Sequence, residues 1–122
     1  MSDIQRIDSP DQRFYILVTS NEMRMSHWVN NAALWARDPA HLLQEIGDWQ
    51  WSSDQIEWSA DSQRVTIGLR RYPGDAPGIT IDIYPDRQIA IPQASAETQP
   101  VPFARLNAFL ERYYQQHRHT SR

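Results

Sequence analysis

The strongest constraint on the fold is a regular alternation of apolar and polar residues. Within residues 64–72, apolar side chains occupy positions 65, 67 and 69, and within residues 79–84 they occupy positions 79, 81 and 83. A period of two is typical of a β-strand that buries one face. The Pro- and Gly-rich stretch 73–78 predicts a turn between them, so the two segments form a hairpin. With the turn centred near Asp75, we expect these facing pairs: Leu69 with Ile81, and Ile67 with Ile83.

Segments of similar character extend this pattern toward both ends of the chain. Turn residues such as Ser9-Pro10, Asp38-Pro39 and Gly47-Asp48 separate them. The further predicted strands are residues 13–20, 23–35, 41–46, 55–59 and 88–91. Residues 23–35 form either one long strand or a pair of strands interrupted by Asn30-Asn31, and a helical turn is the alternative for 41–46. Apolar residues on both faces of 13–20 indicate a strand that is covered on both sides. We therefore predict an antiparallel β-meander of six or seven strands over residues 13–91.

The C-terminal quarter of the chain predicts one helix. Residues 92–101 have the composition of a linker, and residues 117–122 that of a flexible tail. Between them, residues 102–116 carry an apolar stripe at helical spacing, formed by Phe103, Leu106, Phe109, Leu110 and Tyr113. Such a stripe needs an apolar partner, and the sheet face with the isoleucines supplies one. The prediction is a single α+β domain, 1–122, with the helix packed on a sheet face.

Composition excludes several classes of protein. The 122 residues include no Cys, so disulfides, thiol nucleophiles and Cys-ligated zinc are excluded. A net charge of −3 argues against a nucleic-acid partner, whose binding proteins are normally basic. The chain has no apolar run long enough for a signal peptide or a membrane span, so we expect a cytoplasmic protein without a membrane partner. The four Gly and four His residues form no phosphate loop or metal motif, so no cofactor is predicted.

The segment from Asp48 to Asp61 is the first candidate for a functional surface. It combines carboxylates with indoles and contains no basic residue. Charge of one sign steers a partner of the opposite sign, and an indole fills a desolvated cavity on that partner. The predicted partner-binding residues are Asp48, Trp49, Trp51, Asp54, Glu57 and Asp61. The alternative is a solvated turn whose Trp side chains belong to the core.

Two other sets of residues suggest different functions. Glu22, Arg24, His27 and Trp28 place an acid, a base and an Arg close together, as general acid–base catalysis requires. The same residues can equally form an ion pair and a core histidine. A small-molecule site is the other alternative, with Trp28, Trp35 and Tyr84 lining an open sheet face, although a small-molecule ligand is the less favoured partner.

The chain carries two resemblances to known groups of proteins. The stretch Ser9 to Arg13 is echoed by Trp58 to Arg64, and both resemble the phrase that opens the second strand of many β-propeller blade repeats. One chain of this length holds fewer than two blades, so the likeness favours a meander. In size, acidity, aromatic-rich acidic loop and β-meander with a helix, the chain also resembles the immunity proteins of bacterial toxin systems. That resemblance implies a cognate protein toxin as partner, a one-to-one complex, inhibition rather than catalysis, and no cofactor.

Overall fold

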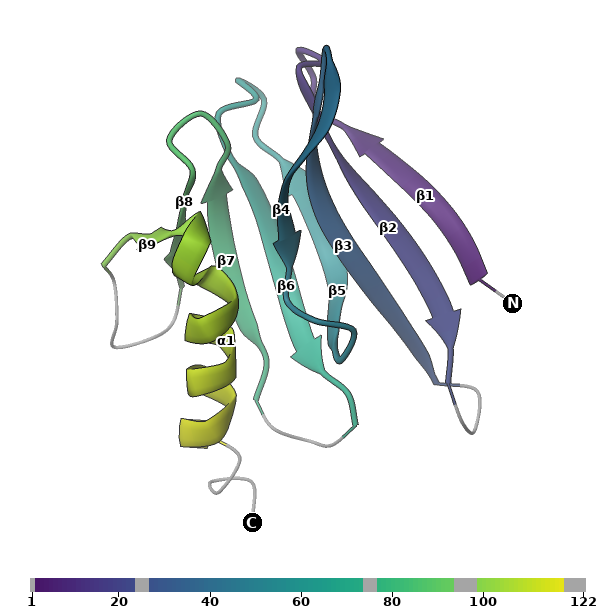
Figure 1. Cartoon of the computed structure of the whole chain (residues 1–122), viewed down its shortest axis with the longest axis vertical. Helices are drawn as coiled ribbons and strands as arrows, with labels where there is room; N and C mark the ends of the chain where they lie inside the picture. Colours follow the sequence, from purple (N-terminus) through teal and green to yellow (C-terminus); the bar gives the residue numbers. More distant parts are fainter. Residues whose placement is uncertain (1, 24–26, 74–76, 94–98, 118–122) are drawn as a thin grey trace.

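Two antiparallel sheets and a C-terminal helix make up the structure, which confirms the α+β class. The computed structural model describes residues 2–23, 27–73, 77–93 and 99–117 (Figure 1). The first sheet contains, in spatial order, β1 (Ser2–Asp8), β2 (Phe14–Glu22), β3 (Trp28–Arg37) and β4 (Ala40–Ile46). The second contains β5 (Trp51–Trp58), β6 (Val65–Arg71), β7 (Ile79–Tyr84), β8 (Ile89–Pro92) and β9 (Val101–Pro102). The helix α1 (Phe103–His117) follows directly.

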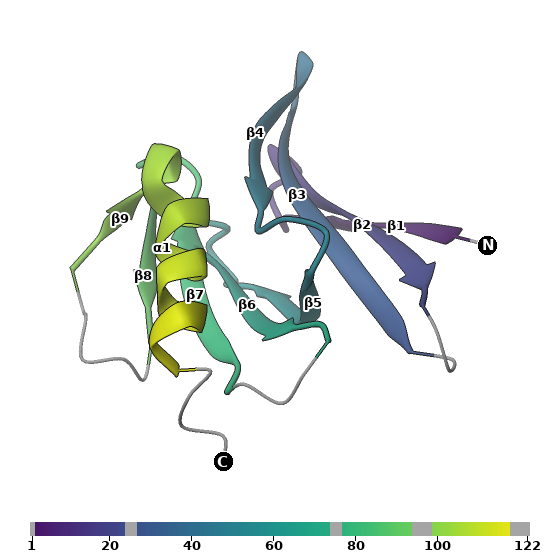
Figure 2. The same cartoon turned by 60° about the horizontal axis from the view of Figure 1, so that its bottom comes forward.

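The prediction of a single meander of six or seven strands is wrong. The described residues form nine strands, and the meander divides between β4 and β5 into sheets of four and five strands. Instead of pairing with β4, β5 lies against β3, where the backbone N–H of Asn30 donates to Ser52 Oγ at 2.9 Å. Figure 2 shows the two sheets meeting along β3 and β5. Strand alternation is the same in one sheet or two, so the sequence pattern does not reveal the division.

Most strand boundaries also differ from the predicted ones. β1 lies before residue 13, where the predicted meander begins, and a polar edge strand of this kind lacks strong apolar alternation. The predicted strand 23–35 starts later in the structure: β2 extends to Glu22, and β3 runs without interruption from Trp28 to Arg37. Residues 41–46 are confirmed as strand rather than a helical turn. Part of the predicted linker, residues 94–98, and the tail residues 118–122 lie outside the described residues.

The central hairpin has the expected faces but a different register. Ile67 lies opposite Ile81, and Leu69 lies opposite Ile79. The predicted pairs are therefore displaced by two residues. A displacement of two preserves which side chains share a face, so the same apolar set still points inward. The apolar pattern determined the face, and the length of the loop determined the register.

One hydrophobic core joins both sheets and the helix. Ile16 and Leu34 of the first sheet, Ile67 and Ile81 of the second, and Leu106 of α1 are all fully buried in it. The helix contacts β8 and β9 and reaches the first sheet, where Asn107 Oδ1 accepts the N–H of Gly47 at 2.8 Å. The predicted helix, 102–116, and its packing on a sheet face are confirmed to within one residue at each end.

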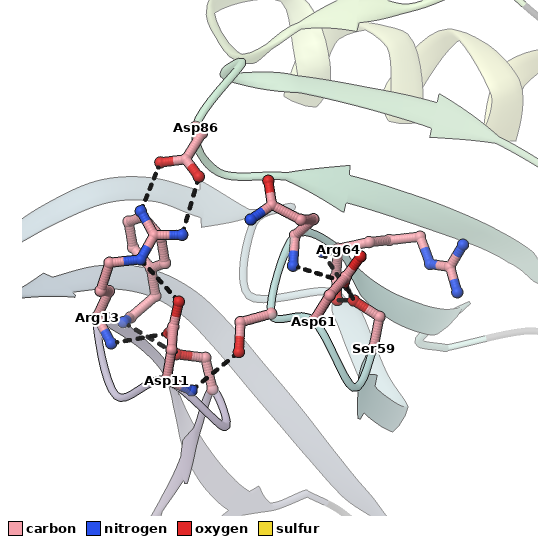
Figure 3. Close-up of polar contacts among 10 residues, drawn as sticks. Asp11, Arg13, Ser59, Asp61, Arg64 and Asp86 are labelled. Carbon is pink, nitrogen blue, oxygen red and sulfur yellow. Dashed lines mark hydrogen bonds and ion pairs between the residues drawn. The ribbon is translucent and has the colours of Figure 1, made fainter.

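The two similar stretches of sequence, Ser9 to Arg13 and Trp58 to Arg64, form turns of the same geometry. In each turn a Ser hydroxyl donates to the Asp two residues on, Ser9 to Asp11 at 2.8 Å and Ser59 to Asp61 at 2.7 Å. Each turn then places one residue at positive φ, Gln12 at 62° and Ser62 at 63°. The turns lie side by side, because the N–H of Asp11 donates to Ser62 Oγ at 2.9 Å (Figure 3). The pair of turns thus joins the two sheets at one end.

Candidate functional site

The segment Asp48 to Asp61 does not form one surface. It runs from the loop before β5, along the whole strand, into the turn before β6. Eight strand residues span roughly 26 Å, so Asp48 and Asp61 lie at opposite ends. Trp51 is 2% exposed and belongs to the core, whereas Trp49 is 57% exposed. The prediction that Trp51 contacts a partner is therefore wrong. Aromatic content alone does not distinguish an indole that fills the core from one that faces solvent.

Asp54 is held by the protein itself. It lies at a β-bulge in β5, and its carboxylate pairs with Arg70 at 2.9 Å. The same group accepts from Ser52 Oγ at 2.5 Å and from Asn30 Nδ2 at 3.3 Å. These contacts compensate its charge and connect β5 to β3. Glu57 is exposed and lies opposite Thr66 on the polar outer side of the second sheet.

Asp61 belongs to the pair of turns at the far end of β5. Its carboxylate accepts from Ser59 and from the N–H of Gln63, and these hydrogen bonds lower its pKa. Beside it, the Arg13 guanidinium lies between Asp11 at 2.7 Å and Asp86 at 2.9 Å (Figure 3). The hydrogen bond from Arg13 lowers the pKa of Asp11 to about 2. These groups serve the junction between the sheets.

The acid–base set lies on an exposed hairpin. Glu22 and Trp28 face each other at the ends of β2 and β3, and both are exposed. His27 is also exposed, with its ring 5.8 Å from that of Tyr72. Arg24 lies outside the described residues. The described members of this set are therefore solvated, which does not provide the enclosed site that acid–base catalysis requires.

The proposed small-molecule set is not brought together either. Trp35 faces outward from the first sheet, whereas Trp28 occupies the opposite alternation on the same strand. Tyr84 is in β7 of the second sheet. No single sheet face holds these three side chains.

The outer face of the first sheet exposes an apolar surface that sequence reasoning missed. Its side chains form rows across the strands, as cross-strand partners share a face. The rows, from β1 toward β4, are Ile4–Thr19–Asn31, then Arg6–Leu17–Ala33–Glu45, then Asp8–Tyr15–Trp35–Leu42. Ile4 is 69% exposed and Leu42 is 45% exposed. The prediction that residues 13–20 are covered on both faces is wrong, since the structure leaves this face open.

A groove of about 380 Å³ crosses this outer face and ends at the loop before β5. We call it the outer-face groove; it is lined by Leu17, Thr19, Asn31, Ala32, Ala33, Trp35, Leu42, Glu45, Gly47, Asp48 and Trp49. Asn31 Nδ2 donates to the carbonyl of Trp49 at 3.0 Å, which fixes the loop against β3. Trp35 stacks on Tyr15 with 6.2 Å between ring centroids, so its indole is also held in place. The groove therefore unites Asp48 and Trp49 of the predicted set with apolar residues from three strands.

The second sheet presents a different character on its outer side. Its central strands β6 and β7 carry Thr66, Gly68, Arg70, Thr80 and Asp82 there. Asp82 accepts a hydrogen bond from Thr66 at 2.6 Å, so these polar groups pair among themselves. Of the two outer faces, that of the first sheet is the more apolar.

The chain matches no protein-family model, no curated protein and no solved structure. Within the described part of the chain, α1 falls short of the length and apolar character that a membrane-spanning helix needs. The described residues also bring no three His, Asp or Glu side chains together in a way that could hold a metal ion.

Proposed function

We propose that this protein binds another protein through the outer face of its first sheet and acts as a stoichiometric inhibitor of the immunity type. The observation that carries the proposal is the exposure of Leu42 and Trp49 in one groove, together with exposed Ile4 beside Thr19 on the same sheet face. A contiguous apolar patch rimmed by polar residues is a common mark of a protein–protein interface. The aromatic centre of this patch has the composition of a binding hot spot.

The shape of the surface favours a protein partner over a small ligand. The apolar rows extend over four strands, from Ile4 at one edge to Leu42 at the other. The groove is open, and Trp49 projects from its end with more than half of its surface exposed. A broad, open surface of this kind is covered by a second protein rather than by a small molecule, which needs deeper enclosure.

Charge supports a basic partner. Residues 1–63 carry a net charge of −6, and residues 64–122 carry +3. Glu45 and Asp48 place that negative charge at the outer-face groove. Negative charge at a rim raises the association rate with a basic surface. A toxin with a basic active cleft, neutralised in the cytoplasm by occlusion of that cleft, fits this chemistry.

Surface plasmon resonance against the protein encoded beside this chain tests the proposal. Leu42→Glu combined with Trp49→Ala is expected to raise the dissociation constant at least about 30-fold, which corresponds to a hot-spot loss of about 2 kcal/mol. Glu57→Gln is the matched control, because Glu57 is exposed on the other sheet. If the groove variant binds with wild-type kinetics and the control binds more weakly, the proposal is wrong and the interface lies on the second sheet.

A further inference from the structure

Arginine side chains cover many of the aromatic rings in this structure. The guanidinium carbon lies 4.6 Å from the ring centroid for Arg6 over Tyr15 and 4.8 Å for Arg13 over Phe14. Arg71 lies 4.1 Å from the Tyr114 ring in the same way. The quadrupole of an aromatic ring attracts a cation above its face, and a planar guanidinium also stacks on it. The pairing of Arg with aromatic rings is thus a repeated device of this fold.

Several carboxylates are paired with Arg in the same fold. Asp54 pairs with Arg70, Asp86 with Arg13, and Glu111 with Arg71. Most of these pairs connect different elements, so they serve the fold itself. Each of these three charges is compensated within the chain.

The outer-face groove holds both kinds of group, aromatic rings and carboxylates, without an Arg beside them among the described residues. Trp35 and Trp49 line it without an Arg over either ring, and Glu45 and Asp48 line it without an ion pair, as far as the described residues extend. Asp48 Oδ1 accepts the N–H of Gln50 at 2.9 Å, which orients the carboxylate and leaves its second oxygen for another donor. Two indoles and two carboxylates therefore line one groove without a cation from the described part of the chain.

We propose that the outer-face groove binds an arginine side chain of the partner protein. This inference rests on the proposed function and names the group that the surface recognises. The guanidinium stacks on Trp49 or Trp35 and donates to the carboxylates of Glu45 and Asp48, while the aliphatic stem packs on Leu17 and Leu42. Arginine fits better than lysine, since its planar fork stacks on an indole and meets a carboxylate with two hydrogen bonds.

Titration with short peptides tests this inference without the partner. The probe is acetyl-Gly-Arg-Gly-amide, followed by the indole N–H signals of the five Trp residues in ¹H–¹⁵N spectra. We expect the signals of Trp35 and Trp49 to move, with a dissociation constant on the order of 1 mM. The buried indole of Trp51 is the internal control and should not move. The comparison probes are the same peptide with Lys or norleucine in place of Arg, and free arginine.

Variants of the groove test which of its side chains bind the Arg peptide. Glu45→Gln with Asp48→Asn should weaken the Arg peptide at least tenfold, and Trp49→Ala should weaken it similarly. The Asn at position 48 keeps an oxygen that accepts the Gln50 N–H, so the loop is retained. Glu57→Gln is the control that removes one charge elsewhere, and it should change binding less than twofold.

Each other outcome overturns the inference in a defined way. Equal shifts from the norleucine peptide would show that the groove recognises only apolar groups. Equal affinity for the Lys peptide would show that the guanidinium group is not specifically recognised. Free arginine that binds as tightly as the peptide would indicate a small-molecule ligand in place of a polypeptide. Loss of partner binding in the Leu42/Trp49 variant, without any response to the Arg peptide, would refute this inference and leave the proposed function standing.

Discussion

Two tryptophans two residues apart should differ sharply in what they contribute to stability. Trp51 is 2% exposed, and Trp49 is 57% exposed. Truncation of a buried Trp to Ala costs about 3–5 kcal/mol through lost burial and a residual cavity. Trp51 also lies 5.7 Å from the Arg71 guanidinium, so its removal takes away a cation–π contact as well. We therefore expect Trp51→Ala to lower the free energy of unfolding by about 4 kcal/mol, and Trp49→Ala by less than about 0.5 kcal/mol.

Urea unfolding followed by circular dichroism measures this difference. With an m-value of about 2 kcal/mol/M, the midpoint should fall by about 2 M for Trp51→Ala and by less than about 0.3 M for Trp49→Ala. The milder variant Trp51→Phe keeps a ring in the core and should give an intermediate shift if the Ala variant does not fold. Equal midpoints for the Trp49 and Trp51 variants would refute the burial of Trp51, and with it the reasoning that separates the core indole from the surface indole.

Three further predictions concern the fold. Leu106→Ala should cost about 2–5 kcal/mol, since Leu106 is fully buried, while Gln115→Ala on the exposed side of the same helix should leave the unfolding midpoint unchanged. Gly47→Ala should cost about 1–3 kcal/mol in the same titration, because its φ is 77° and a methyl group there would lie 2.6 Å from Trp51 Cβ. The pKa of Asp11 falls from its usual 3.8 to about 2 beside Arg13, so the ionised carboxylate stabilises the fold above pH 4 and this contribution is lost as the pH falls toward 2. Asp11→Asn should therefore lower the melting temperature at pH 7, and its difference from the wild type should shrink between pH 4 and pH 2; a constant difference would contradict the ion pair.

Local pattern was sufficient for much of the secondary structure. The alternation through Ile67 and Ile81 predicted the central hairpin, and the stripe through Leu106 predicted the helix and its burial. The repeated Ser-x-Asp turns were visible as an echo, because each turn is made by hydrogen bonds between residues close in the chain. These features depend on neighbours within a few positions, which the sequence shows directly.

The division into two sheets and the place of the functional surface were decided by contacts between distant residues. Asp54 and Trp51 satisfied every local criterion for an exposed binding site, yet Arg70 holds one and the core encloses the other. Leu17 was expected under a covering layer, and the structure leaves it beside an open groove. Alternation tells which residues share a strand face, but only packing determines which face another layer covers. The sequence by itself therefore determined most of the strands, the helix and their apolar faces, and the tertiary structure decided which of those faces is left uncovered.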